Sequence, residues 1–368
     1  MLNEPLIPLI LNVFFFKNKF EVSVTPFSVL VTLTGVIASG GSLWHNNRRF
    51  VLRQLRDLGM GKSRMVAAVQ WQGTQLVQQL KNQAGRPGPL PRALEVAVVN
   101  VIWQMVAGDE RSVLVTIPQK EIEEHRATLD RDNPRDLIDG YLMMMEEKDF
   151  QVSLFSKTLA KDLAILVLDL FLTGNETTST TLTWMIYYLA TYPEVQQKMQ
   201  AEIDEVLPKG TLATLDDKMP YTEAVIHETL RKSSLVPTGV QHVATRDTQL
   251  GGYYIPKGTV VIGAQEVIHH DPRYWNRPDE FLPERWLDQQ GKFTPRKEGF
   301  LPFGVGKRSC LGEALARMEL FVLSTTVFQS LTISQPPGKK IDLRHDPKVF
   351  FSHSAKIQDV LITIRPGF

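Results

Sequence analysis

The sequence predicts a mainly α-helical protein with a minor β part. Most of the chain beyond residue 40 consists of segments in which apolar residues recur at helical spacing, bounded by proline or glycine. Residues 241–271 instead contain two alternating runs separated by glycine and proline turns, a pattern typical of short strands. Hydrophobic residues make up 43% of the chain, which is ample for a buried core.

Charge, cysteine content and length limit the possible classes of protein. The formal net charge is +1, so the molecule as a whole has no electrostatic reason to bind nucleic acid, and we expect no such partner. The single cysteine excludes an internal disulfide and fits a reducing compartment. Residues 1–34 are an atypical N-terminal segment, whose apolar run at residues 6–16 is shorter than the roughly 20 residues that span a bilayer. Residues 35–368 are interpreted as a single domain.

The expected helices follow one another along most of the chain. They occupy residues 44–58, 62–82, 93–106, 118–126, 137–147, 159–191, 193–207, 219–234 and 313–331. Strands are expected within residues 241–271 and around residues 345–356. The longest helix is apolar on most sides, so we expect it to be buried in the middle of the domain. A membrane-spanning helix is the alternative, but Asp162, Asp169 and Glu176 interrupt its apolar run.

The centre of this long helix carries the sequence TGNETT at residues 173–178. A glycine beside hydroxyl side chains that can bond the backbone predicts a local bulge or kink. Thr177 and Glu176 supply a hydroxyl and an acid, the two kinds of group that a proton relay needs. The alternative is that Thr177 and Thr178 are ordinary helix residues and that Glu176 is a solvated acid.

The only cysteine lies in the sequence FLPFGVGKRSCLG, immediately before the last expected helix. This stretch fills the pattern F-x-x-G-x-R-x-C-x-G with Phe303, Gly306, Arg308, Cys310 and Gly312. A cysteine thiolate can ligate haem iron, and we interpret Cys310 as that metal ligand. A lone cysteine is more often a small buried hydrophobic residue, but five constrained positions in so short a stretch favour the haem interpretation.

The other positions of the pattern each suit a place beside a haem. Phe303 would shield the sulfur, and Gly306 would let the backbone approach a flat macrocycle without a Cβ clash. The guanidinium group of Arg308 suits a propionate carboxylate. The helix that opens at Gly312 would favour negative charge on Cys310, because helix N-termini attract anions.

Two further pairs stand at helical spacing. Trp44 and Arg48 are four residues apart and share a helix face, although such a pair alone is more often a core anchor and a solvated charge. Glu228 and Arg231 are three apart in a helix whose apolar neighbours imply burial. A buried ion pair needs further partners, and we expect Arg285 in the PERW sequence to be the third member.

Three histidines deserve comment because imidazole can bind metals and carboxylates. His242 begins the first alternating run, where a core or edge histidine is the ordinary interpretation. His269 and His270 form a possible metal pair, but no third ligand stands at a useful spacing.

These motifs resemble those of the cytochrome P450 family, specifically its animal microsomal family 2 type, which oxidises drugs and fatty acids. The resemblance extends from about residue 35 onward and is carried by WHNNRRFVLRQLRDLGMGKSR, NPRDLIDGYL, MPYTEAVIHETLR and FLPFGVGKRSCLGEALARMELF. It implies the P450 fold and a haem-thiolate monooxygenase domain. Such a domain inserts one atom of O₂ into an apolar organic substrate, here a xenobiotic, fatty acid or steroid-like molecule.

The resemblance also implies roles and partners. It implies that the haem propionates are held by Trp44, Arg48, His242 and Arg308. It implies that protons are delivered by Thr177 and Glu176. Electrons would come from NADPH through the flavoprotein NADPH-cytochrome P450 reductase, with cytochrome b5 as a further partner. The location implied is the cytoplasmic face of the endoplasmic reticulum membrane.

The chain also departs from the family pattern. Thr173 occupies a position that is usually alanine or glycine, and Gln241 one that is usually proline. Members carry an anchor helix, an opening helix and a sheet where this chain has residues 1–43. They also carry two long helices over the substrate pocket where this chain has only a few residues, near 107–120. The sequence therefore predicts a truncated monooxygenase, with a catalytically silent haem-binding protein and a cysteine-nucleophile hydrolase as alternatives.

Overall fold

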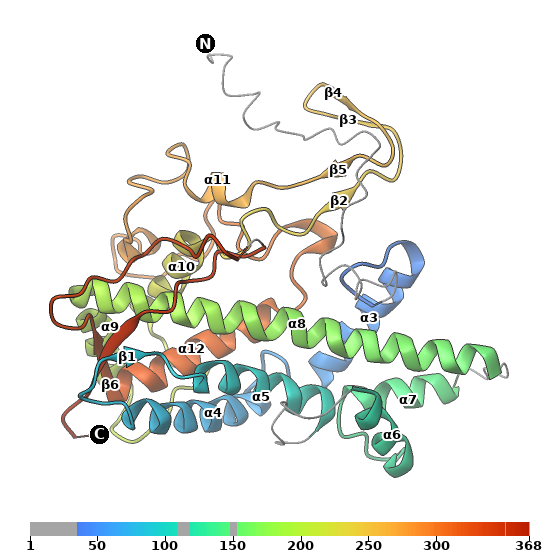
Figure 1. Ribbon diagram of the computed structural model, residues 1–368, viewed down its shortest axis with the longest axis horizontal. Helices are drawn as coiled ribbons and strands as arrows, with labels where there is room; N and C mark the ends of the chain where they lie inside the picture. Colours follow the sequence, from blue (N-terminus) through green and yellow to red (C-terminus); the bar gives the residue numbers. More distant parts are fainter. Residues whose placement is uncertain (1–34, 109–117, 148–152, 350, 368) are drawn as a thin grey trace.

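The computed structural model describes residues 35–108, 118–147, 153–349 and 351–367. Within these ranges the protein is mainly helical with a few short strands, as the sequence predicts (Figure 1). The helices are α3 (Gly41–Asp57), α4 (Ser63–Lys81), α5 (Ala93–Ala107), α6 (Pro118–Thr128), α7 (Leu137–Glu147), α8 (Ser153–Thr191), α9 (Pro193–Val206), α10 (Pro220–Ser233), α11 (Gln265–His269) and α12 (Glu313–Ser330). Two short 3₁₀ helices are η2 (Pro283–Trp286) and η3 (Gly306–Arg308). The predicted atypical segment, residues 1–34, lies outside the described residues.

The strands of the described residues form three small antiparallel sheets. The first has the order β1–β7–β6 and joins β1 (Gly88–Pro89), β7 (Asp359–Ile364) and β6 (Leu331–Ser334). The second pairs β2 (His242–Val243) with β5 (Val260–Val261), and the third pairs β3 (Thr248–Leu250) with β4 (Tyr253–Ile255). The β3–β4 hairpin is therefore nested inside the β2–β5 pair, as the alternating runs and their glycine turn predict.

Helix α8 runs through the middle of the molecule (Figure 1). Helices α4, α5 and α12 lie on one side of it, and strands β2 to β5 lie on the other. Three large residues in its C-terminal half, Trp184, Met185 and Leu189, are at most 1% exposed. No helix in the described ranges is both long enough and apolar enough to cross a bilayer. The burial of Trp184, Met185 and Leu189 and the place of α8 in the middle of the molecule confirm the predicted buried central helix.

Three element predictions were wrong in detail. α8 begins at Ser153, six residues earlier than the expected start at residue 159. Residues 153–158 contain no proline or glycine that would interrupt the helix. α11 replaces the end of the predicted strand region, since QEVIH lacks the alternation of a strand. Among the described residues around 345–356, the structure has only an isolated bridge between His345 and Ala355. The strand lies later in the chain, in β7, where the apolar residues alternate.

Candidate functional site

The loop before α12 presents Cys310 at the protein surface. Gly304 and Gly306 have φ angles of 69° and 75°, a left-handed conformation that glycine adopts at little cost. A hydrogen bond of 2.7 Å from the backbone N–H of Cys310 to the carbonyl oxygen of Phe303 closes the loop. A Cβ on Gly306 would meet no atom within 4 Å, so the space beside it is open. The exposed Cys310 side chain is thus accessible to a ligand.

The surroundings of Cys310 act on its thiol in opposite directions. Burial among the loop atoms raises the pKa of the thiol, although part of the side chain stays exposed. The backbone N–H groups of Gly312 and Glu313 and the charge of Arg48 lower this pKa, while the charge of Glu313 raises it. The N-terminus of α12 therefore acts in the predicted direction, but burial outweighs it. The free thiol is favoured until a metal cation binds the sulfur.

Trp44, Arg48 and Arg308 converge beside this loop. The guanidinium carbon of Arg308 lies 4.0 Å from the centre of the Trp44 ring, and that of Arg48 lies 5.8 Å from it. Arg48 donates a hydrogen bond of 2.8 Å to the backbone oxygen of Ser309. Arg308 donates one of 2.6 Å to the backbone oxygen of Ser39. Sequence spacing placed Trp44 and Arg48 on one helix face, and the fold brings Arg308 to them.

The cluster of Trp44, Arg48 and Arg308 presents hydrogen-bond donors and positive charge. No carboxylate of the described residues pairs with these groups. Burial and the nearby charge of Arg48 lower the pKa of Arg308. The Nε1 atom of Trp44 is buried and has no hydrogen-bond partner among the described residues. An unpaired buried donor costs about 1–3 kcal/mol. The cluster therefore fits the carboxylate of a bound ligand, such as a haem propionate.

Phe303 of the cysteine loop contacts both the hydrophobic core and Arg317 of α12. Its ring packs against the hydrophobic core, and the guanidinium carbon of Arg317 lies 5.0 Å from its centre. Arg317 in turn pairs with Glu313 at 2.9 Å and lies 2.7 Å from Nε2 of His227 on α10. Burial and the charge of Arg317 lower the pKa of His227 to about 3, so the ring is neutral and Nε2 accepts the hydrogen bond.

His242 does not join this cluster. It lies on β2, where it pairs with Val261 of β5, and it is exposed. Within the described ranges it makes no hydrogen bond or ring contact with Trp44, Arg48 or Arg308. Its place beside a propionate stays a prediction from resemblance.

The TGNETT segment lies within α8, which is continuous helix through these residues, and the local bulge or kink stays a prediction. Gly174 has a different use: a Cβ there would lie 2.6 Å from Cδ1 of Ile102 on α5. Thr173 and Thr177 each donate a hydrogen bond of 2.7 Å to the carbonyl one turn earlier. The glycine therefore permits close packing of two helices, and these hydroxyls bond the helix without opening it.

Thr177 and Glu176 are not connected to each other by a hydrogen bond in the described structure. The Thr177 hydroxyl bonds the backbone oxygen of Thr173. Glu176 is exposed and accepts a hydrogen bond of 3.5 Å from Ser352 near the C-terminus. A relay between these two side chains stays a prediction.

The ion-pair network predicted on α10 is present and buried. Glu228 and Arg231 are both 0% exposed, and two hydrogen bonds of 2.8 and 2.9 Å join them. Arg285 donates a hydrogen bond of 3.1 Å to Glu228, which confirms the predicted third member. Trp286 adds a fourth, donating a hydrogen bond of 3.0 Å from Nε1 to Glu228. Arg231 also donates to the backbone oxygens of His269, Pro278 and Glu280.

Comparison with known proteins gives this site its context. Residues 110–359 match the sequence profile described as cytochrome P450. The chain belongs to the cytochrome P450 family. Cytochrome P450 2L1 of Panulirus argus is 40% identical over 412 aligned residues, covering 95% of this chain and 83% of that protein. Cytochrome P450 2B19 of Mus musculus is 38% identical, with 84% of this chain and 73% of that protein covered. For cytochrome P450 2J3 of Rattus norvegicus the values are 36%, 88% and 74%.

Membership in the P450 family settles the class of protein. P450 proteins are monooxygenases with a haem cofactor whose iron is held by a cysteine thiolate, so the chain is a P450 monooxygenase with the predicted helical fold. The hydrolase alternative is wrong. In addition to the family match, no histidine in the described part of the chain hydrogen-bonds to Cys310, so the base that a cysteine nucleophile needs is not in place.

His269 supports the P450 cysteine loop in a way that the sequence did not predict. Its Nε2 accepts a hydrogen bond of 2.9 Å from the backbone N–H of Leu301, and its Nδ1 lies 2.9 Å from the hydroxyl of Ser234. Burial and the charge of Arg231 lower the pKa of His269 to about 3, so the ring is neutral. Both ring nitrogens have protein partners, which leaves none for a metal pair with His270.

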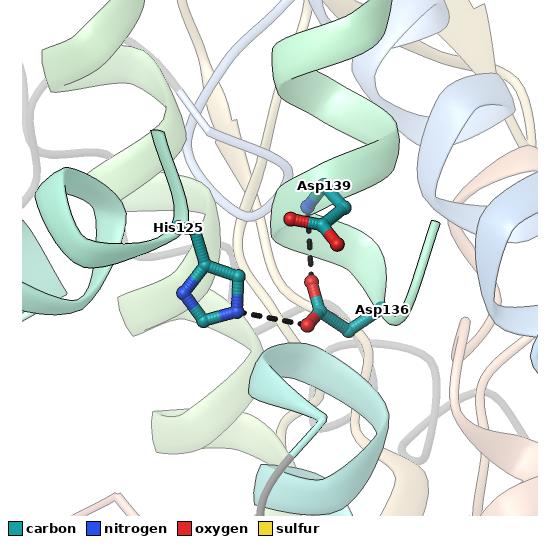
Figure 2. A group of neighbouring side chains, drawn as sticks. All are labelled: His125, Asp136 and Asp139. Carbon is teal, nitrogen blue, oxygen red and sulfur yellow. Dashed lines mark hydrogen bonds and ion pairs between the residues drawn. The ribbon is translucent and has the colours of Figure 1, made fainter. Parts of the chain in front are cut away.

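A second buried cluster of this P450 chain joins α6 to α7 (Figure 2). His125 lies with Nε2 at 2.8 Å from Asp136 and Nδ1 at 2.8 Å from the Glu121 carbonyl oxygen. Asp136 accepts the backbone N–H of Asp139, and Asp139 pairs with Arg135 at 2.6 Å. His125, Asp136 and Asp139 hold metal-binding atoms within 4.8 Å of one another. Because these groups already bond to each other and to Arg135, we interpret the cluster as a structural link between the helices.

This link predicts a pH dependence of stability. Burial opposes protonation of His125, but the hydrogen bond and charge of Asp136 outweigh it, so the pKa of His125 is raised. A raised pKa contributes stability that is fully present below the unfolded value of about 6.5 and is lost as pH rises through the folded value. Urea unfolding of wild type and His125→Gln should therefore differ more at pH 5.5 than at pH 9. An equal difference at both pH values would contradict the prediction, and exposed His45→Gln is the control.

Proposed function

We propose that this P450 binds haem through Cys310 and inserts one atom of O₂ into an apolar organic substrate. The supporting observation is the exposed Cys310 thiol beside a buried, unpaired Trp44 N–H and two guanidinium groups. Bound haem would supply the oxygen-activating redox chemistry. Cys310 would hold the iron as a thiolate, while Trp44, Arg48 and Arg308 would orient the macrocycle through its carboxylates.

Other residues would complete the haem site. The open space beside Gly306 would let the macrocycle lie close to the backbone, and Phe303, clamped by Arg317, would cover the sulfur. His242 would donate to a propionate by analogy with the family.

Thr177 and Glu176 would move protons for the oxygen chemistry that bound haem would supply. The Thr177 hydroxyl would release its hydrogen bond to the Thr173 carbonyl oxygen. Its Oγ1 atom would then hold a proton that is being transferred. Glu176 is exposed, so its carboxyl group can exchange protons with solvent. Together the two side chains would carry protons from water to the reacting oxygen.

The electron donor would be NADPH-cytochrome P450 reductase, with cytochrome b5 as a second redox partner. The docking face for these partners would be basic, because oppositely charged surfaces steer redox partners together. Arg49, Arg56 and Lys307 are exposed and offer such charges. Arg317 is less available, because Glu313 and His227 hold it.

The substrate and location follow from the resemblance to family 2 proteins. We propose a xenobiotic, a fatty acid or a steroid-like molecule, and a place at the cytoplasmic face of the endoplasmic reticulum membrane. The named relatives, cytochromes P450 2L1, 2B19 and 2J3, support the resemblance to family 2 on which this proposal rests.

One observation favours the second candidate, a catalytically silent haem-binding protein. The alignment with the Panulirus protein spans 412 positions, more than the 368 residues of this chain, so it includes positions at which this chain has no residue. This supports an internal deletion, which we place near residues 107–120 of the monooxygenase domain, residues 35–368. Loss of the helices there would leave the substrate side uncovered.

Turnover separates the two candidates. The protein is expressed with a haem precursor and mixed with NADPH, purified reductase and either lauric or arachidonic acid, under isotopically labelled O₂. A monooxygenase yields hydroxylated or epoxidised product that carries one labelled oxygen atom. Haem uptake with neither labelled product nor reductase-dependent NADPH oxidation would support the silent binder, and the absence of haem uptake would contradict both candidates.

A further inference from the structure

A carboxyl group on the central helix holds a segment to which the roles above give no function. Asp169 lies on α8 and is partly buried. Its Oδ2 atom accepts a hydrogen bond of 2.7 Å from the backbone N–H of Val36 and one of 3.1 Å from that of Ile37. Residues 35–39 precede α3 and belong to no helix or strand. One side-chain oxygen atom therefore ties this irregular segment to the helix in the middle of the molecule.

The backbone of residues 35–39 is shaped for this contact. Gly35 has a φ angle of 84°, a conformation that glycine adopts at little cost. A Cβ on Gly35 would lie 2.3 Å from Oδ2 of Asp169, so any larger residue would displace the carboxyl group. The carbonyl oxygen of Gly35 accepts hydrogen bonds from Ser39 at 2.5 Å and from Asn47 of α3 at 2.9 Å. The segment thus has fixed partners on both α8 and α3.

The same segment holds the guanidinium group of Arg308. Arg308 donates hydrogen bonds to the backbone oxygens of Ile37 at 3.4 Å and of Ser39 at 2.6 Å. Its guanidinium carbon lies 4.0 Å from the centre of the Trp44 ring. Ile37 therefore gives its N–H group to Asp169 and its carbonyl oxygen to Arg308. A shift of this segment would move the two acceptors that direct the guanidinium group.

The contact with Asp169 needs an acceptor oxygen and no charge. Burial raises the pKa of Asp169 and outweighs the hydrogen bonds from Val36 and Ile37, which lower it. A carboxylate and a neutral carboxyl group both keep an oxygen that accepts hydrogen bonds, so the contact exists in either protonation state. Asparagine has a carbonyl oxygen in the same place, whereas leucine has a similar shape and accepts no hydrogen bond.

We propose that Asp169 is a positioning residue of the haem site, which fixes residues 35–39 and, through their carbonyl oxygens, directs Arg308 toward a haem propionate. This inference rests on the proposed binding of haem. An arginine side chain has many rotamers, and fixing it before the ligand arrives removes much of the entropy cost of binding. Loss of the Asp169 oxygen should therefore weaken haem retention and leave the iron ligand unchanged.

The first test measures backbone hydrogen exchange in the purified full chain and does not depend on haem. Exchange in residues 35–40 should be about fivefold faster in Asp169→Leu, the factor expected from loss of one ordinary hydrogen bond. Asp169→Asn should match wild type within about twofold. Asp288→Leu is the matched control, because Oδ1 of Asp288 also accepts two backbone N–H groups, those of Gln290 and Lys292, in an exposed turn. This control should leave exchange in residues 35–40 unchanged.

Two results of the exchange experiment would overturn the inference. One is equal exchange of residues 35–40 in wild type and Asp169→Leu, which would show that the carboxyl group does not hold the segment. The other is equal acceleration in Asp169→Asn and Asp169→Leu, which would show that an acceptor oxygen is not what the segment needs.

The second test measures the rate at which haem leaves the holoprotein for an excess of an apo-globin acceptor. Asp169→Leu should release haem about fivefold faster than wild type, while its reduced carbon monoxide complex keeps the thiolate-type band. Asp169→Asn should stay within about twofold of wild type. Because Asp169 would act through Arg308, adding Asp169→Leu to Arg308→Ala should accelerate release little further.

Fully multiplicative effects of Asp169→Leu and Arg308→Ala on haem release would overturn the inference, because independent residues give such effects. Wild-type release in Asp169→Leu would overturn it as well. Absence of haem from the wild-type protein would contradict the proposed function itself, and with it the part of the inference that concerns haem. The exchange experiment separates that failure from a failure of Asp169 to hold residues 35–39.

Discussion

Replacement of Cys310 by serine is expected to abolish the thiolate-type absorption band of the reduced, carbon monoxide-bound protein. A hydroxyl group remains protonated where a thiol ionises, so serine cannot supply the negatively charged sulfur ligand. Cys310 is the only cysteine of the chain, and no other thiol can replace it. Labelled product should fall to background in the same variant, because the thiolate is what favours O–O cleavage.

The neighbouring substitution Ser309→Ala is the matched control for Cys310→Ser. It leaves the backbone carbonyl that accepts a hydrogen bond from Arg48 in place. This control should keep the wild-type band. A thiolate-type band in Cys310→Ser would show that another ligand holds the iron and would contradict the assignment.

Replacement of Glu228 by alanine is expected to lower the free energy of unfolding by about 3–5 kcal/mol, the cost of breaking a buried ion pair from one side. Arg231 would keep its charge at 0% exposure, and Trp286 and the backbone N–H of Leu282 would lose their acceptors. Such a loss is a large part of the about 5–15 kcal/mol that stabilises a typical domain. Denaturant unfolding measures the change, and haem uptake should fall because this network borders the cysteine loop.

An exposed ion pair provides the control for Glu228→Ala. Lys339 pairs with Asp359 at 2.8 Å, but the two side chains are 66% and 35% exposed. Lys339→Ala should therefore cost no more than about 1 kcal/mol. Arg231→Lys should behave like Glu228→Ala, because an ammonium group cannot reproduce the contacts that the planar guanidinium makes. Equal losses in Lys339→Ala and Glu228→Ala would contradict the account of this network.

Much of the helical framework was predictable because its signals are local. Proline at the start of α9 and α10, glycine after α3 and apolar spacing within α4 and α7 all act within a few residues. The short α11 and the position of β7 were predicted wrongly, although QEVIH lacks alternation and the apolar residues of β7 alternate. The role of Gly174 was missed because its close contact with α5 is a tertiary feature that no local pattern records.

The candidate site was likewise predictable only where its residues lie close together in the sequence. Spacing in sequence identified Cys310 within its loop and the pairs Trp44 with Arg48 and Glu228 with Arg231. No pattern pointed to the contact of His269 with Leu301, because it joins segments 32 residues apart. The hydrogen bond from Arg317 to His227 was missed for the same reason, since the two residues are 90 positions apart in the chain. Long-range hydrogen bonds of this kind leave no local signal.

The carbon monoxide spectrum of the reduced wild-type protein tests the central claim most directly. The protein is expressed with a haem precursor, reduced, exposed to carbon monoxide and scanned through the Soret region. If Cys310 holds haem iron as a thiolate, the spectrum will show the red-shifted Soret band of a thiolate-ligated haem. A Soret band at the position of a histidine-ligated or unligated haem, or no haem band at all, would contradict the claim.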